Sequence, residues 1–230
     1  MRQPRFVPER GNMKAVIFDM DGVIFDSEYA TYLSWQKIAE REKLPDFDDV
    51  YKRCIGVTYE VTKQICLDAY GQDFPYEKFA KEASLIYHER YDGGRLPVKE
   101  GARELLSYLK ENAIPTAIAS STREERVVIQ LKEAGLLSYF DEVVGGDCVK
   151  RSKPAPDIFL LAAERLGIAP ADCVVIEDSY NGIRAAHAAG MIPVMVPDML
   201  EPNEEMQGLC RAICETLTEV KRKMAEESVF

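Results

Sequence analysis

The sequence predicts an α/β protein, a doubly wound, mainly parallel sheet with a bundle of helices inserted after its first strand. Three observations lead to this prediction. A short apolar run at 15–18 ends at two aspartates, residues 29–91 show helical periodicity without a strand pattern, and beyond residue 97 apolar strands alternate with amphipathic helices. Strands that alternate with helices are typical of parallel βαβ units.

The first strand, Ala15 to Phe18, is apolar and partly β-branched, which suits a strand buried on both faces of a parallel sheet. The helical stretch after it should divide into four helices, because proline and glycine interrupt its periodicity. We expect helices from about 29 to 44, from 48 to 54, from Thr58 (which can cap its helix) to about 70, and from 76 to 91.

Asp92-Gly93-Gly94 and Pro97 mark the return of the chain to the sheet. The elements expected beyond them are a helix at 100–112, a strand at 115–119, a helix that ends at Gly135, a strand at 140–144, a helix at 156–166, a strand at 173–176, a helix that ends at Gly190, a strand at 192–196 and a charged helix in the tail after Glu201. The sheet is thus predicted to have five strands, with the charged tail helix as an outer layer.

These elements group into a flexible N-terminal arm at 1–12, an α/β core at 13–28 and 93–230, and a helical domain at 29–92. The arm carries three arginines but no apolar stretch, so it does not read as a secretory signal, and Met13 is an alternative start.

The net charge of −10 argues against a nucleic-acid partner and against binding to an anionic membrane surface. No apolar run is long enough to span a bilayer. Six cysteines without a CxxC pair predict reduced thiols and a cytoplasmic location, and Cys210 and Cys214 are expected to share one helix face. With only two histidines, chemistry built on histidine bases is not expected. We expect a monomer.

Polar side chains follow several predicted strands at the point where each strand ends. Asp19 and Asp21 follow the first strand, Ser120-Ser121 the second, and Glu177-Asp178 the fourth, while Lys153 lies in the loop after the third. The carboxyl ends of parallel strands meet in one crevice, so these residues should converge. Four carboxylates at one point would repel each other, and a hard cation with oxygen ligands, Mg²⁺, is the expected cofactor.

These residues also have ordinary structural explanations. Asp19 and Asp21 could be solvated aspartates of a turn, because Asp-Gly is a common turn signal. Ser120 could cap a helix, Lys153 could be a solvated loop lysine, and Glu177-Asp178 could cap the next helix. It is the whole set, at successive strand ends, that indicates a site.

The segment Asp19-Met20-Asp21-Gly22-Val23 resembles the first motif of haloacid dehalogenase-like phosphotransferases, in the branch that holds β-phosphoglucomutases and small sugar-phosphate phosphatases. The further motifs at Ser120, Lys153 and Glu177-Asp178 follow in the order of that family, and the resemblance runs from about Met13 to at least Pro197. It implies a Rossmann-like core, a helical cap domain and Mg²⁺-dependent phosphoryl transfer on a small phosphate ester.

The resemblance also implies a role for each residue. Asp19 would be the nucleophile that forms an aspartyl-phosphate. Asp21 would be the general acid and base, and its backbone carbonyl a metal ligand. The remaining roles are metal binding for Asp19, Asp178 and the nearby Glu177, and phosphate binding for Ser120, Ser121 and Lys153.

The cap loop Ile55-Gly56-Val57-Thr58 resembles the loop that faces the active site in this branch, which makes Thr58 a candidate substrate-binding residue. The chain departs from the mutases just after it. Tyr59 stands where β-phosphoglucomutases carry an arginine able to grip a second phosphate, and Ala83 aligns with a cap lysine. Both departures favour hydrolysis of a phosphomonoester, such as a sugar phosphate, over a phosphohexomutase. Tyr59 could instead pack within the helical bundle.

Two other classes of protein share part of this pattern. A haloacid dehalogenase would need neither the Asp21 acid nor the metal-binding pair. A two-component receiver also uses a phosphorylated aspartate and Mg²⁺, but it carries that aspartate later in the chain and has no helical insert.

Overall fold

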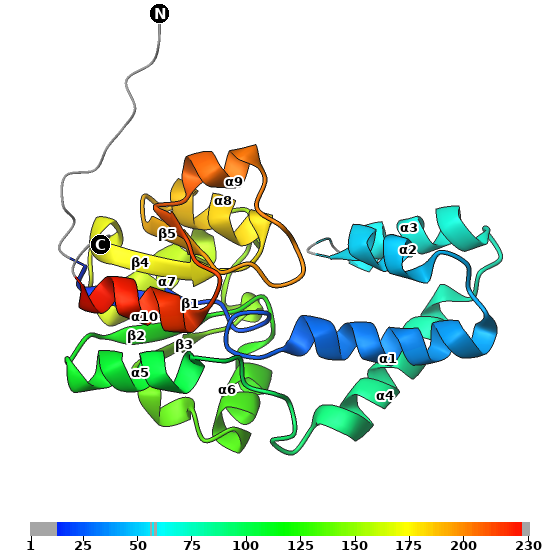
Figure 1. Cartoon of the computed structure of the whole chain (residues 1–230), viewed down its shortest axis with the longest axis horizontal. Helices are drawn as coiled ribbons and strands as arrows, with labels where there is room; N and C mark the ends of the chain where they lie inside the picture. Colours follow the sequence, from blue (N-terminus) through cyan, green and yellow to red (C-terminus); the bar gives the residue numbers. More distant parts are fainter. Residues whose placement is uncertain (1–12, 56, 58, 227–230) are drawn as a thin grey trace, which may run out of the picture.

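The computed structural model describes residues 13–55, 57 and 59–226. Figure 1 shows an α/β core with a group of helices beside it, which we call the insert. The insert follows directly after β1 (Ala15–Phe18). Its helices are α1 (Ser27–Glu42), α2 (Phe47–Cys54), α3 (Tyr59–Tyr70) and α4 (Tyr76–Tyr91). The fold class predicted from the sequence is thereby confirmed.

The core continues with alternating helices and strands. They are α5 (Ala102–Glu111), β2 (Thr116–Ala119), α6 (Glu124–Glu133), β3 (Glu142–Val144), α7 (Asp157–Leu166), β4 (Cys173–Glu177), α8 (Tyr180–Ala188), β5 (Ile192–Met195), α9 (Glu204–Leu209), β6 (Ala212–Ile213) and α10 (Leu217–Ala225). Short 3₁₀ turns lie at Leu137–Tyr139, Gly146–Cys148 and Pro170–Asp172.

The sheet formed by the described strands has the order β3-β2-β1-β4-β5-β6, and every pair is parallel. The sequence predicted five strands, and β6 is the sixth. This strand has only two residues, which pair with Val194 and Met195, and two residues are too few to show a strand pattern. Cys210 and Cys214 lie on either side of β6, so the prediction that they share a helix face is wrong.

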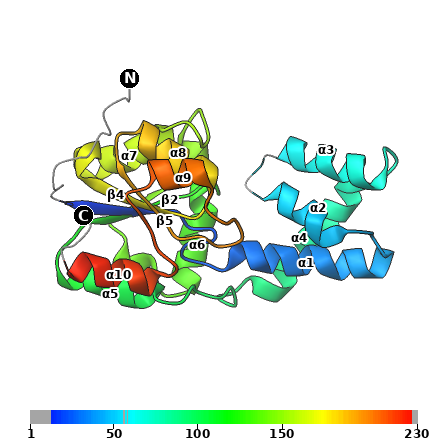
Figure 2. The ribbon, with the colours of Figure 1, turned by 45° about the horizontal axis from the view of Figure 1, so that its top comes forward.

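The alternation of side chains along β1 explains the three layers. Val16 and Phe18 belong to the core cluster that includes residues of α5, α6 and α10, whereas Ala15 and Ile17 pack with residues of α7 and α8. Figure 2 shows α7 and α8 on one side of the sheet and α5 and α10 on the other. Because both faces are covered, β1 is buried throughout, as the apolar run at 15–18 predicts.

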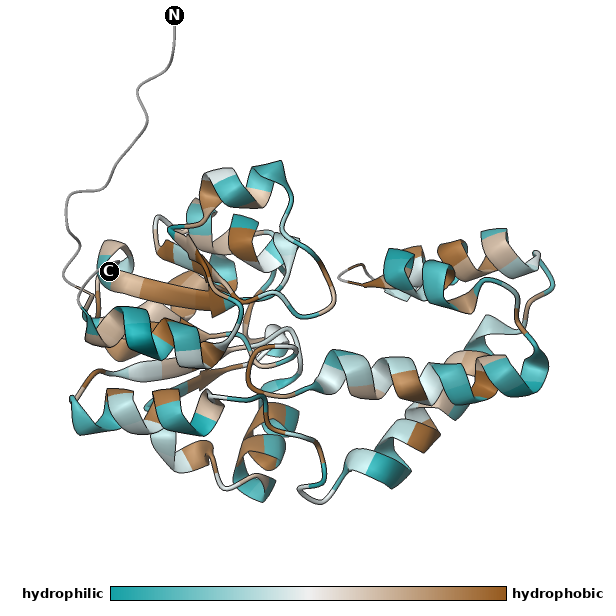
Figure 3. Ribbon diagram, in the orientation of Figure 1, coloured by the Kyte–Doolittle hydropathy of each residue, from teal (hydrophilic) through white to brown (hydrophobic). Residues whose placement is uncertain are grey.

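The insert has a small core of its own. Ile38 of α1 packs there against Phe79 and Ala83 of α4. Figure 3 shows β4 in the colours of hydrophobic residues along most of its length, while the helices of the insert carry both apolar and polar residues. Within the described part of the chain, we find no helix with the length and apolarity needed to cross a membrane.

The two linkers between core and insert run side by side. Phe25 and Val98 form an isolated antiparallel bridge, and the Asp26 amide donates a 2.9 Å hydrogen bond to the carbonyl oxygen of Pro97. Lys99, just beyond this bridge, donates to Asp198 Oδ1 at 2.6 Å. Both linkers therefore leave the core beside the carboxyl end of β1, and His88 of α4 adds a contact with Arg126 of α6.

Candidate active site

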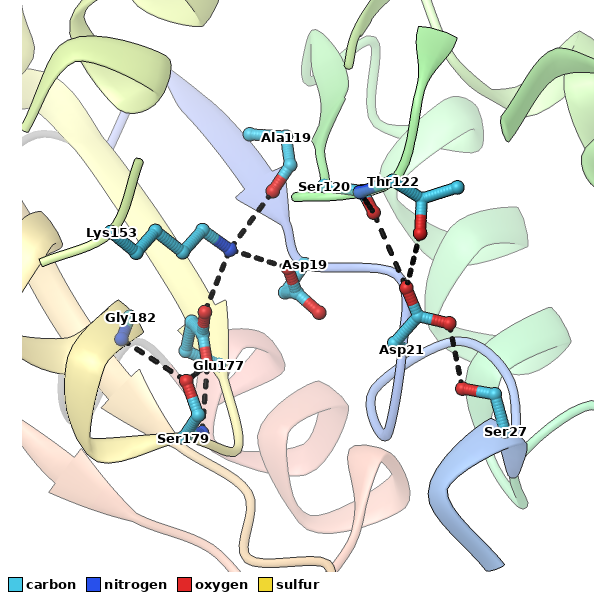
Figure 4. Close-up of polar contacts among 10 residues, drawn as sticks. All are labelled: Asp19, Asp21, Ser27, Ala119, Ser120, Thr122, Lys153, Glu177, Ser179 and Gly182. Atoms are coloured by element: carbon cyan, nitrogen blue, oxygen red, sulfur yellow. Dashed lines mark hydrogen bonds and ion pairs between the residues drawn. The ribbon is translucent and has the colours of Figure 1, made fainter. Parts of the chain in front are cut away.

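The residues predicted to be functional lie where neighbouring strands end. Asp19 directly follows β1, Ser120 directly follows β2, and Glu177 is the last residue of β4. Since β2 and β4 flank β1, these side chains meet at one edge of the sheet. Figure 4 shows the group, with Lys153 reaching in from the loop before α7.

Lys153 makes the central ion pairs of the site. Its Nζ atom donates to Asp19 Oδ1 and, at 2.8 Å, to Glu177 Oε1. It also donates to the carbonyl oxygen of Ala119 at 3.1 Å and lies 4.8 Å from the centre of the Phe159 ring. The side chain is only 7% exposed, so Lys153 is a fixed positive charge beside Asp19 rather than a mobile surface lysine.

Burial and charge shift the pKa values of both partners. Burial raises the pKa of Asp19 to about 8; Lys153 opposes this rise, and nearby carboxylates add to it. Burial lowers the pKa of Lys153, but the carboxylates of Asp19 and Glu177 outweigh burial and raise it above its ordinary value. Lys153 therefore stays charged, and the remaining buried negative charge would be stabilised by a cation.

Three hydroxyl groups surround the Asp21 carboxylate. Ser27, the first residue of α1, donates to Oδ1 at 2.8 Å. Thr122 and Ser120 donate to Oδ2 at 3.1 and 3.3 Å. Asp21 is thus oriented from the core and from the first turn of the insert at once. Sequence reasoning missed Ser27 and Thr122; Thr122 stands two residues after Ser120, whereas Ser27 lies four residues beyond the motif at 19–23.

Asp178 follows β4 and lies against the turn after β1. A Cβ atom on Gly22 would come within 2.4 Å of Asp178 Oδ2, and Gly22 has a φ of +77°. Both the space and the backbone conformation therefore require glycine. Burial raises the pKa of Asp178 well above its ordinary value, and Glu177 and Asp19 add to the rise. Asp178 brings a further carboxylate to the peptide that joins Asp21 to Gly22.

Glu177 has both of its oxygens occupied by donors from the protein. Oε1 accepts from Lys153, and Oε2 accepts from the amide and the hydroxyl of Ser179 at 2.7 and 2.9 Å. Ser179 in turn caps α8 by accepting from the Gly182 amide at 3.1 Å. In this arrangement Glu177 orients Lys153 and the start of α8.

The described residues include no group of three or more His, Cys, Asp or Glu side chains placed to share an ion. The resemblance assigns metal binding to the carboxylates of Asp19, Asp178 and Glu177 and to the backbone carbonyl of Asp21, but both oxygens of Glu177 already accept from Lys153 and Ser179. The carboxylates of Asp19 and Asp178 and the Asp21 carbonyl remain as donors. All three donors are oxygens, which suit a hard divalent cation. Burial, and after it the neighbouring carboxylates, raise the pKa of both Asp19 and Asp178, so a cation bound between them would favour their charged forms. The donor set therefore fits Mg²⁺.

Other predicted residues do not join this group. Ser121 is exposed, and its side chain hydrogen-bonds to no described residue; Thr122 makes the inward contact instead. Thr58 lies outside the described residues. Ala83 is 2% exposed in the core of the insert, so a side chain at this position points into the insert. The absence of a lysine there is thus no argument about the substrate.

Tyr59, the first residue of α3, is 53% exposed while its ring packs against Tyr76 at a centroid distance of 5.3 Å. At the position where the mutases carry arginine, the Tyr59 ring thus packs within the insert and also has half of its surface exposed to solvent.

Glu28, in the first turn of α1, is an acidic residue that sequence reasoning did not select. Burial raises its pKa to about 7, and the carboxylates of Asp21 and Asp198 add to the rise. The side chain is only partly exposed, and its backbone carbonyl accepts from the Tyr51 hydroxyl at 3.1 Å. The junction between core and insert is thus acidic close to Asp21.

The parallel sheet covered by helices on both faces, the helical insert after β1 and this group of carboxylates define the class to which the chain should be compared. A family model described as haloacid dehalogenase-like hydrolase matches residues 13–190. The chain therefore belongs to the haloacid dehalogenase-like hydrolases, in the branch of β-phosphoglucomutases and sugar phosphatases with a helical cap.

The relatives fall on both sides of the distinction between hydrolysis and isomerisation. The chain is 37% identical over 183 residues to a phosphorylated carbohydrates phosphatase from Thermotoga maritima, with 78% of this chain and 82% of the relative covered. It is 36% identical over 191 residues to a β-phosphoglucomutase from Bacillus subtilis, with 80% and 83% covered.

Among solved structures, a HAD family hydrolase from Deinococcus radiodurans R1, crystallised with bound phosphate and sodium, superposes with a TM-score of 0.80 at 28% identity. The alignment covers 94% of this chain and 97% of the other.

Proposed function

We propose that the protein is a Mg²⁺-dependent phosphatase that hydrolyses a small phosphomonoester, such as a sugar phosphate, through an aspartyl-phosphate on Asp19. The observation that carries this proposal is the pairing of Asp19 with the buried Lys153, next to an Asp21 oriented by three hydroxyl groups. One carboxylate is thus fixed beside a positive charge, and the other is aimed by donors from two directions.

Asp19, Asp178 and the backbone carbonyl of Asp21 would hold the cation. Bound there, Mg²⁺ supplies positive charge that offsets the substrate phosphate and the clustered carboxylates. Glu177 adds negative charge to this environment while keeping Lys153 in place.

The reaction divides into two steps. With Asp21 protonated, a carboxylate oxygen of Asp19 attacks phosphorus. The bond between phosphorus and the ester oxygen breaks, and Asp21 gives its proton to that oxygen, so the alcohol departs neutral. Asp21 then takes a proton from water, whose oxygen attacks the aspartyl-phosphate and frees inorganic phosphate. Lys153 and the Ser120 hydroxyl stabilise charge on the phosphoryl oxygens.

The helical domain, proposed at 29–92 although α1 begins at Ser27, would act as the cap that covers the substrate and excludes water. The exposed Tyr59 offers an aromatic ring in place of a cation. This feature supports a monophosphate as the substrate.

A phosphohexomutase is the second candidate, because one of the similar relatives is a β-phosphoglucomutase. A mutase must retain a bisphosphate intermediate, and the described cap offers Tyr59 where an arginine would bind it.

The test is release of inorganic phosphate from a panel of phosphomonoesters with Mg²⁺, beside an isomerisation assay with β-glucose-1-phosphate and a sugar bisphosphate. We expect hydrolysis without efficient isomerisation. Asp19→Asn should lower turnover by roughly 10³-fold or more, since an amide is a poor nucleophile of nearly the same shape.

Asp73→Asn is the matched control, because it makes the same chemical change on an exposed residue of the insert. Efficient isomerisation by the wild type would favour the mutase instead. Retention of more than a few per cent of activity by a folded Asp19→Asn variant would remove Asp19 as the nucleophile.

A further inference from the structure

Two cysteines of the insert lie against each other. Cys54 is the last residue of α2, and Cys66 lies in α3, which packs on α2. Their thiols are hydrogen-bonded to each other. Cys66 is 1% exposed, whereas Cys54 is partly exposed and follows the exposed Arg53. The pair thus combines an accessible sulfur with a buried one.

The environment makes the two sulfurs chemically unequal. The hydrogen bond from Cys66 lowers the pKa of the Cys54 thiol; burial opposes this, and the charge of Arg53 lowers it further. The same hydrogen bond, together with burial, raises the pKa of Cys66. Cys54 is therefore the sulfur that more readily becomes the nucleophilic thiolate, and Cys66 keeps its proton.

The other cysteines of the chain are placed differently. Cys148 donates to Glu124 Oε2 at 2.9 Å, and Cys173 donates to the Ala169 carbonyl at 3.5 Å. Cys210 and Cys214 are separated by β6. In the described part of the chain, thiol faces thiol at 54 and 66.

We propose that Cys54 and Cys66 are a redox modification site at which a low-molecular-weight disulfide reversibly forms a bond between α2 and α3. The Cys54 thiolate attacks one sulfur of the oxidant and releases one thiolate, giving a mixed disulfide on Cys54. Cys66 then loses its proton and attacks Cys54 Sγ, which releases the second thiolate. Two electrons pass from the two cysteines to the oxidant, which ends as two thiols.

The bond would restrain the end of the insert that bears Tyr59. Tyr59 begins α3, the helix that carries Cys66, and its ring packs against Tyr76 at the start of α4. Oxidation should therefore alter substrate binding at the cap more than the chemical step at Asp19, a consequence that rests on the proposed phosphatase activity.

The experiment treats the full chain with oxidised glutathione. We expect free thiols to fall from six to four and the mass to fall by about 2 Da, with a tryptic link between peptides 54–63 and 64–78. Dithiothreitol should restore all six thiols. In Cys66→Ser the mixed disulfide should be trapped on Cys54, and in Cys54→Ser neither the link nor an adduct on Cys66 should form. Cys210→Ser, the control, should keep the link.

The wild-type protein alone can overturn the proposal. It would do so if both thiols stayed free after oxidation, or if either cysteine formed a disulfide with a different cysteine. An at least twofold change in KM, with kcat less affected, is expected on oxidation. A linked protein with unchanged KM would refute the effect on the cap. A linked protein inactive in both redox states would refute the phosphatase and leave the modification site standing.

Discussion

Gly22 is the residue at which the backbone of the site has the least freedom. Gly22→Ala would place a methyl group within 2.4 Å of Asp178 Oδ2 and force an alanine to a φ of +77°. We expect the concentration of Mg²⁺ for half-maximal activity to rise at least about tenfold, because Asp178 must move, a loss of about 1.4 kcal/mol in binding. A Mg²⁺ titration of phosphate release measures this.

Gly167→Ala is the control that separates the steric clash with Asp178 from the backbone strain of a positive φ. Gly167 has a similar φ of +69°, but a Cβ there meets no atom within 4 Å. Both variants should lose about 1 kcal/mol of stability to the left-handed backbone. A Gly22→Ala enzyme with the Mg²⁺ dependence of Gly167→Ala would contradict the placement of Asp178 at the metal.

Glu28 should make the stability of the protein depend on pH. Its pKa is raised from 4.5 to about 7 in the folded state, so folding favours the protonated form. The folded state then binds more protons than the unfolded one, and stability falls as the pH rises from about 5 to 8. Because Glu28 is partly exposed, we expect a loss of about 2 kcal/mol, less than the full shift implies.

Urea denaturation at pH 5 and pH 8, in the presence of a chelator, compares the wild type with Glu28→Gln. The variant should be the more stable protein at pH 8, and the difference should shrink at pH 5. Glu89→Gln, an exposed residue of α4, serves as the control and should follow the wild type. If the free energy of unfolding changed equally between pH 5 and pH 8 in all three proteins, the pKa of Glu28 would not be raised by folding.

Much of the site could be predicted at the level of residues, because Asp19, Ser120 and Glu177 stand at strand ends and parallel strands bring such ends together. What could not be predicted is the direction in which neighbouring side chains point. Thr122 reaches Asp21 while Ser121 is exposed, and only the turn after β2 decides between them. Ser27 escaped notice because its partner lies across the turn after β1.

At the scale of elements, long periodic segments were predicted well and short edge segments were not. The predicted helix at 76–91 coincides with α4, since its apolar spacing extends over several turns. By contrast, β6 has two residues and α9 has six, and their existence depends on packing against β5 and α8. Tertiary contacts, rather than local pattern, determine such elements.

The start of α3 is the element that should govern substrate choice. Tyr59→Arg would place a planar guanidinium at the exposed start of the helix, worth about 1.5–3 kcal/mol in a well-placed contact with phosphate. We expect the inhibition constant of a sugar bisphosphate to fall about tenfold or more, with a smaller change for the monophosphate.

Leu85→Arg adds the same charge to α4, at a residue that is 61% exposed, and controls for net charge. Equal gains for both variants would indicate a general electrostatic effect. No selective gain for Tyr59→Arg would show that this side chain points away from the substrate.

For the whole molecule, the clustered carboxylates predict that Mg²⁺ stabilises the fold. Ions that bind only the folded state add about 2.7 kcal/mol at a hundredfold excess over the dissociation constant, which corresponds to a rise of about 5–10 °C in the melting temperature of a chain of this size. Calorimetry with and without a chelator measures it. Asp178→Asn should abolish most of the rise, and Asp73→Asn should leave it intact; an equal rise in both would place the ion elsewhere.

The pairing of the two linkers also has a consequence for how the chain tolerates the loss of the insert. Phe25 and Val98 form an antiparallel bridge, and the Asp26 amide donates to the Pro97 carbonyl oxygen. The two linkers are therefore paired like the strands of a hairpin that lacks its turn. Closing it with an Asn-Gly turn in place of residues 27–96 should leave the register of the sheet unaltered. Such a chain should still unfold cooperatively in a thermal melt, at a lower temperature; a non-cooperative melt would contradict this. The insert could then be replaced as a unit. Recombination of the gene segment that encodes it could give the same α/β core a new substrate.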